Sequence, residues 1–82
     1  MVIRLKLFAI LRERAGDVAE LQLELPAGAT AQDARRMVGQ RFPSLRELLP
    51  RAAVAVNCDY VSASTQLSDG DELALIPPVS GG

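Results

Sequence analysis

The chain has 82 residues, a formal net charge of −1 and an apolar fraction of 49%. This length fits one small globular domain, and the near-neutral charge argues against nucleic acid or an anionic membrane as a partner. There is no histidine and one cysteine, which excludes a histidine-based catalytic site, an intrachain disulfide and a cysteine-cluster zinc site. No stretch has the length of a membrane span or the layout of a signal peptide, so we expect a cytoplasmic protein that binds no metal and no cofactor of its own.

The first 25 residues predict two strands. Apolar and polar residues alternate over residues 2–8 and again over residues 20–25, which is the period of a half-buried strand. Residues 9–17 between them carry mixed charges and a glycine, so we expect a loop or turn there. The two strands should therefore form an antiparallel hairpin with their leucines in one apolar layer.

A helix is predicted over residues 31–41. Thr30 has the properties of its N-cap, and Asp33, three residues further on, comes close to a capping box. Gly39 inside the helix costs roughly 1 kcal/mol relative to alanine. Pro43 ends the helix, because proline cannot continue the hydrogen-bond ladder. The residues expected to point inward from this segment are Ala34, Met37, Val38 and Phe42.

The second half of the chain adds one short turn over residues 44–49 and then further strands. Residues 53–57 and 72–76 have strand patterns. Between them, a turn over residues 57–60 precedes a short extended segment that starts at Val61. The second half of the chain therefore adds strands and turns but no second long helix.

The element order is therefore strand, strand, helix, strand, short strand, strand. One helix must cover one face of a mixed sheet of four to five strands, which is a two-layer α+β architecture. This arrangement is the β-grasp, or ubiquitin-like, fold. We assign residues 1–76 to the β-grasp domain and residues 77–82 to a flexible C-terminal tail that ends in Gly-Gly.

Three apolar residues are expected on the solvent side of the sheet. Phe8 has the strand parity of Arg4, and Ile76 has the parity of Glu72. The β-grasp fold makes the first and last strands neighbours, so Phe8 and Ile76 should lie close together, and Tyr60 at the edge of a turn can join them. Scattered apolar side chains are common on protein surfaces, whereas a patch of three is what a docking surface for a partner needs.

The C-terminal tail carries the sharpest signal in the sequence. Pro77-Pro78 stops ladder pairing, because neither residue has an N–H to donate. Gly81-Gly82 has no side chains, so it can thread a narrow channel in a partner. The terminal carboxylate of Gly82 is anionic at neutral pH and a poor electrophile, so acyl or sulfur transfer from it requires activation by a partner. The alternative is a frayed end without a function.

Five different short motifs are spread along the chain: residues 7–9 (LFA), 11–13 (LRE), 25–26 (LP), 42–45 (FPSL) and 54–57 (VAVN). The most specific stretch joins the turn Ser68-Asp69-Gly70-Asp71 to the ending Pro77-Pro78-Val79-Ser80-Gly81-Gly82. Together these motifs resemble the small subunits of molybdopterin synthase, a family of ubiquitin-like sulfur carriers. The resemblance covers the whole chain, and the ending favours the molybdopterin branch over the thiamin branch.

The resemblance implies a cycle that runs on partner proteins. An adenylating enzyme related to ubiquitin-activating enzymes would use ATP and Mg²⁺ to adenylate Gly82, and a sulfur donor such as a cysteine desulfurase or a rhodanese would convert the adenylate to a thiocarboxylate. The large subunit of the synthase would then receive the tail, in a heterotetramer, and deliver the sulfur to cyclic pyranopterin monophosphate. The positions that match the docking surface and tail of this family are Phe8, Tyr60, Ile76, Pro77, Pro78, Val79, Ser80, Gly81 and Gly82.

Three other interpretations stay open from the sequence. The chain can be a sulfur carrier for thiamin, cysteine or thiolated tRNA, in which case only the acceptor differs. It can be a protein modifier that is conjugated to lysines through Gly82. It can also be a plain β-grasp interaction module with an incidental Gly-Gly end, although that interpretation leaves the tail unexplained.

Overall fold

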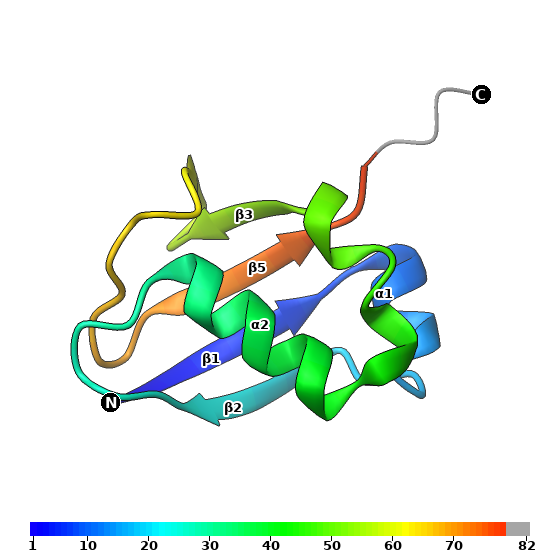
Figure 1. The fold of residues 1–82 in the computed structure, drawn as a ribbon, viewed down its shortest axis with the longest axis horizontal. Helices are drawn as coiled ribbons and strands as arrows, with labels where there is room; N and C mark the ends of the chain where they lie inside the picture. Colours follow the sequence, from blue (N-terminus) through cyan, green and yellow to red (C-terminus); the bar gives the residue numbers. More distant parts are fainter. Residues whose placement is uncertain (79–82) are drawn as a thin grey trace.

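A five-stranded mixed sheet carries the structure, and one long helix lies across one of its faces (Figure 1). This computed structural model describes residues 1–78. The strands are β1 (Val2–Leu7), β2 (Glu20–Glu24), β3 (Ala53–Val56), β4 (Asp59–Val61) and β5 (Glu72–Ile76). The helices are α1 (Ala9–Arg14) and α2 (Ala31–Arg41), and two short 3-10 helices, η1 (Pro43–Leu45) and η2 (Leu49–Arg51), follow α2.

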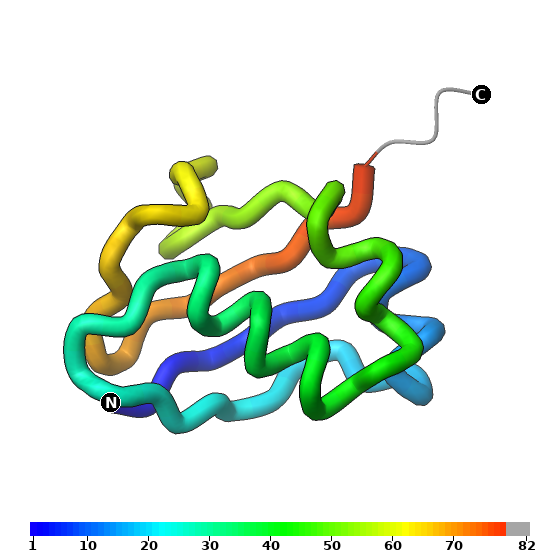
Figure 2. The backbone as a smooth tube through the Cα atoms, in the orientation of Figure 1, coloured from blue at the N-terminus to red at the C-terminus, as the bar shows by residue number. Residues whose placement is uncertain are grey.

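The sheet order is β2-β1-β5-β3-β4, so the first and last strands are neighbours near the middle of the sheet. β1 and β5 pair in parallel, and the other three pairs are antiparallel. Figure 2 shows this pairing as a blue and an orange segment that run side by side. The predicted α+β, ubiquitin-like β-grasp fold and its first hairpin are confirmed. The assignment of residues 77–82 to a flexible tail stays a prediction, because residues 79–82 lie outside the described part of the chain.

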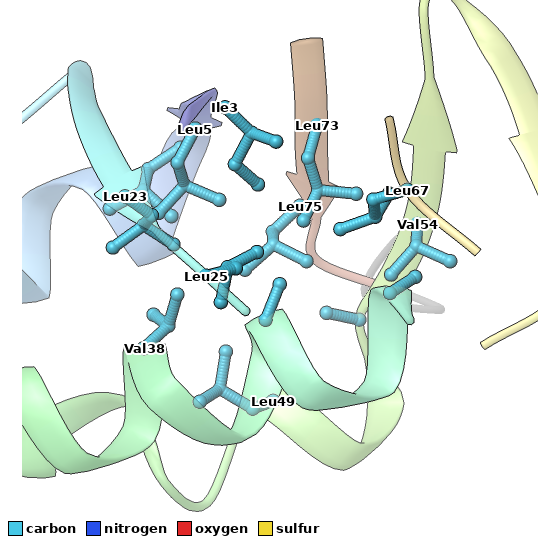
Figure 3. Packing of buried hydrophobic residues seen from close by; sticks show 14 of the residues in the cluster. Ile3, Leu5, Leu23, Leu25, Val38, Leu49, Val54, Leu67, Leu73 and Leu75 are labelled. Carbon is cyan, nitrogen blue, oxygen red and sulfur yellow. The ribbon is translucent and has the colours of Figure 1, made fainter. Parts of the chain in front are cut away.

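The core lies between the sheet and α2 (Figure 3). Ile3, Leu5 and Leu7 of β1 are buried, at the alternate positions that the strand pattern predicts. Leu73 and Leu75 of β5 are fully buried, which places both central strands under the helix. Each such side chain contributes about 1.5–3 kcal/mol when its apolar surface leaves water. The cluster also contains Leu11, Leu23, Leu25, Ala31, Ala34, Val38, Leu45, Leu49, Val54 and Leu67, and the partly buried Met37 and Phe42 pack against it.

α2 has the predicted bounds, Ala31–Arg41. Its capping box is present: the Asp33 N–H donates to Thr30 Oγ1 (3.2 Å), and the Thr30 N–H donates to a carboxylate oxygen of Asp33 (2.9 Å). Gly39 has a packing role, because a Cβ at this position would lie 3.2 Å from Cδ1 of Leu49. The missing side chain therefore lets η2 lie close against the last turns of the helix.

The predicted loop over residues 9–17 is wrong, because α1 occupies Ala9–Arg14. This helix is six residues long and buries only Leu11, so it is too short to show a helical repeat in the sequence. It starts at Ala9 in a left-handed conformation, with a φ of 51°, directly after Phe8 in an extended one. The chain thus changes direction sharply at Ala9, and β1 ends there.

The turn that was predicted over residues 57–60 is shorter than expected. Asp59 and Tyr60 belong to β4, so the turn consists of Asn57 and Cys58, whose φ angles are 50° and 73°. Two-residue hairpin turns of this kind need left-handed backbone at both positions, and asparagine adopts it more readily than most residues. β4 has three residues, which is too few to show an alternation. The short turn predicted over residues 44–49 is present at residues 46–48, between η1 and η2.

The Asp69-Gly70-Asp71 turn is anchored to distant parts of the chain. A carboxylate oxygen of Asp69 accepts from the Val2 N–H (2.7 Å), and the Gly70 N–H donates to the Val2 carbonyl (2.8 Å). Asp71 accepts from the side-chain amide of Asn57 (3.0 Å). Gly70 has a φ of 85°, a conformation that favours glycine. This motif therefore serves the fold, because it fixes the start of β1 and the β3–β4 turn.

Loss of the capping box should destabilise the fold in a pH-dependent way. The backbone and side-chain hydrogen bonds of Thr30 hold the pKa of the Asp33 carboxyl below its ordinary value, with a smaller contribution from Arg36. The unfolded-state pKa is therefore the higher one, so the stabilisation is complete above it and is lost as the pH falls through the folded-state pKa. We expect Thr30→Ala to lower the free energy of unfolding by about 1 kcal/mol at neutral pH.

Denaturant titrations of Asp33→Asn at several pH values complete this test. The variant should lack the part of the acid dependence that belongs to the capping box. Asp59→Asn is the matched control, because the exposed Asp59 side chain makes no hydrogen bond within residues 1–78. An Asp33→Asn variant with the wild-type pH profile would show that the cap does not contribute.

The left-handed backbone at Ala9 generates a second prediction. This conformation costs alanine about 1–2 kcal/mol, whereas glycine adopts it freely. Ala9→Gly should therefore raise the free energy of unfolding, by up to about 1 kcal/mol once the greater chain entropy of unfolded glycine is subtracted. Ala15→Gly is the control at the other end of α1, where φ is −81° and glycine should destabilise. Chemical denaturation of both variants measures the difference, and equal effects would contradict the conformation of Ala9.

Candidate functional site

The face of the sheet away from α2 holds the residues that the sequence singled out. One row runs across it in register from β1 to β4, through Lys6, Ala74, Ala55 and Tyr60. Residues that pair in register point to the same face, so this row lies opposite the core. The row before it starts with Arg4 and Glu72, and the row after it contains Ile76 and Ala53.

Charged side chains occupy one half of this open face. The Arg4 guanidinium lies 3.4 Å from a carboxylate oxygen of Glu72 and 3.9 Å from one of Glu20. The Lys6 ammonium lies 3.3 Å from the other carboxylate oxygen of Glu72. Partly exposed pairs of this kind contribute only about 0–1 kcal/mol each, so their main effect is to neutralise charge beside the apolar residues.

The other half of the open face is apolar. We define the apolar patch as Phe8, Ala53, Ala55, Tyr60, Ala74 and Ile76. Ala55 is 5% exposed and yet is absent from the core cluster, so its neighbours on the open face cover it. Ala74 shares the parity of Glu72 and Ile76 in the sequence, whereas Ala53 and Ala55, which alternate with buried Val54, were missed, and none of the three alanines was predicted as part of the patch. Alanine is apolar and small, which gives no sign of whether it faces solvent.

Phe8 and Ile76 come to the same level of the sheet. Leu7 pairs with Leu75 in the parallel ladder. Phe8 directly follows Leu7, and Ile76 directly follows Leu75. Phe8 keeps extended backbone (φ −124°, ψ 152°), so its side chain continues the parity of Lys6 on the open face, where it is 44% exposed. The predicted proximity of Phe8 and Ile76 is therefore supported by register.

Tyr60 lies on the same face but not beside Phe8. It is 72% exposed on β4, and β3 and β5 separate it from β1. Strands are about 4.8 Å apart, so Tyr60 is roughly 14 Å from the β1 row and the alanines fill the space between. The structure thus places all three predicted residues on one face and adds a floor of small side chains that connects them.

The C-terminal tail starts at the edge of the apolar patch. Pro77 follows Ile76 directly and is half-buried, and Pro78 is exposed. Because β1 and β5 are parallel, their arrowheads point to the same edge in Figure 1, and this edge also carries Phe8. The other predicted tail residues, Val79, Ser80, Gly81 and Gly82, lie outside the described residues.

An open pocket of about 320 Å³ lies beside Phe8, with Lys6, Arg12 and Glu20 among its lining residues. The Arg12 guanidinium donates from Nε to a carboxylate oxygen of Asp17 at 3.0 Å, which holds it in place. Arg12 was part of a sequence motif without an assigned role. Its position places an ion-paired arginine beside Phe8, which the sequence did not predict.

The described residues offer surfaces, and no cluster of reactive groups stands out among them. Within residues 1–78, no group of three or more His, Cys, Asp or Glu side chains is placed to hold a metal ion. The lowered pKa of Asp33 belongs to the α2 cap, on the other side of the sheet. In the same part of the chain, neither helix has the length and apolar character needed to cross a membrane.

Comparison with known proteins identifies the family. The family model described as the ThiS family matches residues 5–82 of this chain. The molybdopterin synthase sulfur carrier subunit of Arabidopsis thaliana is 41% identical over 80 residues, which cover 98% of this chain and 82% of that protein. The solved structure of putative molybdopterin converting factor subunit 1 from Pyrococcus furiosus is 34% identical with a TM-score of 0.85, and the match covers 95% of this chain and 98% of that one.

Two further solved structures have a similar fold and sequence. Small archaeal modifier protein 1 of Haloferax volcanii is 30% identical, with a TM-score of 0.85 over 95% of this chain and 98% of that one. A chain in the complex of subunits 1 and 2 of the molybdopterin-converting factor from Helicobacter pylori is 25% identical, with a TM-score of 0.71 over 100% of both. The family model matches this chain from residue 5 to residue 82, and a curated relative is 41% identical to it. This chain therefore belongs to the ThiS family.

Proposed function

We propose that this chain is a sulfur carrier in molybdenum cofactor biosynthesis, as the small subunit of a molybdopterin synthase. The observation that carries the proposal is the continuity of the apolar patch with the tail: β5 leads through Ile76 into Pro77 and on to Gly81-Gly82. A partner that covers the patch therefore receives the tail at the same edge. The Arabidopsis relative, which is a molybdopterin synthase sulfur carrier subunit, supports this assignment.

The chemistry starts at the C-terminal carboxylate of Gly82. An adenylating partner would join it to AMP from ATP, with Mg²⁺ on the phosphates and pyrophosphate as the leaving group. The persulfide of a sulfur donor, such as a cysteine desulfurase or a rhodanese, would then displace AMP and form an acyl disulfide with Gly82. A second thiol would cleave this S–S bond, leaving the thiocarboxylate on Gly82 and a disulfide on the donor. The large subunit would take up the tail and pass the sulfur to cyclic pyranopterin monophosphate. We place this cycle in the cytoplasm, where thiols stay reduced.

Docking would depend on the apolar patch. Phe8 and Tyr60 are 44% and 72% exposed in the free chain, and aromatic anchors of this kind commonly dominate the binding energy of an interface. Because the tail must reach first the adenylating enzyme and then the large subunit, both partners would cover the same patch and would compete for it. The Helicobacter pylori complex of subunits 1 and 2 supports a large-subunit partner.

A second function has support of its own. The chain is similar over almost its whole length to small archaeal modifier protein 1 of Haloferax volcanii, so conjugation of Gly82 to lysines of other proteins is the alternative. The two functions share the adenylated intermediate and differ in the nucleophile, a sulfur donor or a lysine amine. A carrier for thiamin, cysteine or tRNA thiolation would differ only in the acceptor.

Intact-mass spectrometry tests the tail chemistry. After incubation with a host extract, ATP and a sulfur donor, the purified chain should gain the mass difference between sulfur and oxygen, and fragmentation should locate it at Gly82. Deletion of Gly82 should abolish the gain without changing the thermal midpoint of unfolding, because the core cluster of the described residues 1–78 runs from Ile3 to Leu75. The same extract without ATP is the control.

Two outcomes of this experiment would count against the proposal. Lysine-linked adducts without any mass gain on the free chain would favour the modifier function. A large fall in the thermal midpoint of the deletion variant would mean that Gly82 belongs to the folded core and does not act as a free reactive end. Capture of the large subunit by the charged chain then separates the molybdopterin pathway from the other acceptors.

The docking role of the apolar patch can be tested by truncation. Phe8→Ala and Tyr60→Ala should each weaken binding to the large subunit by about 2 kcal/mol, roughly a thirtyfold rise in the dissociation constant. Val2→Ala is the matched control, because Val2 is 41% exposed on the same strand parity but lies at the opposite end of β1. Titration calorimetry gives the three constants, and equal losses for Phe8 and Val2 would exclude a specific role for the patch.

A further inference from the structure

A second pocket lies on the helix side of the sheet, opposite the apolar patch. We call it the helix-side pocket. It has a volume of about 400 Å³, and its lining residues come from α2 and from the segment that leads from η1 to η2. Its lining includes Arg35, Arg36 and Gly39 of α2, with Arg46, Leu49 and Pro50 from the following segment. Cationic groups and an apolar floor therefore meet in one concave site.

The pocket depends on the close approach at Gly39. Because Gly39 has no Cβ, Leu49 packs against the helix backbone and forms part of the floor. Nε of Arg46 donates to the Gly39 carbonyl at 3.1 Å, and Nη1 of Arg35 donates to the Ala52 carbonyl at 3.2 Å. Two guanidinium groups are thus held in place by main-chain oxygens. Less side-chain freedom remains to be lost when a ligand binds them.

Arg46 keeps its capacity to bind an anion. It is held through Nε, and within residues 1–78 neither of its terminal nitrogens takes part in a hydrogen bond or ion pair. Two parallel N–H donors of a guanidinium match the two oxygens of a carboxylate. Arg36 differs, because it already lies 3.4 Å from a carboxylate oxygen of Asp33. The exposed terminal nitrogens of Arg46 are therefore available to a carboxylate from outside the chain.

Charge is divided unevenly between this segment and the remainder of the chain. Residues 31–51 contain five arginines against Asp33 and Glu47, a net charge of +3, whereas the whole chain carries −1. The residues outside this segment therefore carry a net charge of −4. A partner surface that complements the helix side is acidic, whereas a partner surface that complements the apolar patch is apolar.

We propose that the helix-side pocket is a docking site for an acidic segment of a partner protein. A carboxylate of that segment pairs with Arg46, and an adjacent apolar side chain packs against the exposed Pro50, with the nearly buried Leu49 beneath it. A free phosphate would use the cations but leave the apolar floor uncovered, so a peptide fits both features of the pocket. The inference does not rest on the sulfur-carrier proposal, since it involves neither Gly82 nor the tail.

The position of the pocket has a consequence for assembly. The sheet separates the helix-side pocket from the apolar patch, so a partner on the open face does not cover it. An acidic segment can therefore hold the chain while its patch and tail are engaged elsewhere. This is a useful property for a small protein that is passed between larger ones, because it is never fully released during the exchange.

An NMR titration of the ¹⁵N-labelled full chain tests this proposal. The probe is the blocked peptide Glu-Glu-Leu-Glu-Glu at low salt. Amide shifts should change over residues 32–40 and 46–50 and stay constant in β4 and β5. Arg46→Glu should raise the dissociation constant at least about tenfold, within the range measured for close interfacial charge pairs. Arg46→Gln, which removes the charge without reversing it, should weaken binding as well and covers the case in which Arg46→Glu disturbs the fold.

Arg51→Glu is the matched control. Arg51 is exposed in the same cationic segment but does not line the pocket, so this change shifts the net charge equally and should leave the dissociation constant within about twofold. Equal losses at Arg46 and Arg51 would mean a general charge effect and would overturn the proposal. The peptide Glu-Glu-Gly-Glu-Glu should bind more weakly, and equal affinity would exclude the apolar floor. Inorganic phosphate that reproduces the shifts, with no response to either peptide, would make this a small-anion site instead.

Discussion

The parallel pairing of β1 with β5 determines where the functional parts of this protein lie. Its register, with Leu7 opposite Leu75, brings the carboxyl ends of the first and last strands to one edge of the sheet. Phe8, Ile76 and the start of the tail therefore meet there. An antiparallel pairing of the same strands would have placed Val2 beside the tail, far from Phe8. The long connection that a parallel pair requires also contains α2, which covers the leucines of both strands.

A single helix layer leaves the sheet with one buried face and one solvent-exposed face. A chain of 82 residues is too short to cover both faces of the sheet. The open face must therefore be compatible with water in the free protein. Ion pairs among Arg4, Lys6, Glu20 and Glu72 lie over β2, β1 and the start of β5. Glu20 and Glu24 also place charge on the edge strand β2, which discourages edge-to-edge pairing. What remains apolar is the half that adjoins the tail.

Local signals made most of the fold predictable. Alternating leucines located β1 and β5, and Thr30 with Asp33 located the start of α2, because each pattern lies within a few residues. α1 escaped prediction because its six residues are too few to show a helical repeat, and Ala9 at its start has a left-handed backbone that alanine does not signal. In the site, strand parity placed Phe8 and Ile76 correctly. The alanines have the open-face parity in the sequence, but strand register decides which of them lie side by side, and the helix-side pocket depends on the approach of Leu49 to Gly39. No local pattern encodes the register or this approach.

Under the proposed function, the patch and the tail form two linked contacts with each partner. Sulfur transfer changes only the end of the tail, so the patch is the same in the charged and discharged carrier. Any preference of a partner for one form must therefore come from the tail, while the patch supplies affinity common to both. Two modest linked contacts bind far more tightly together than either does alone, and the complex weakens sharply once one is lost. A small patch built on alanines thus suits a carrier that must leave after delivery.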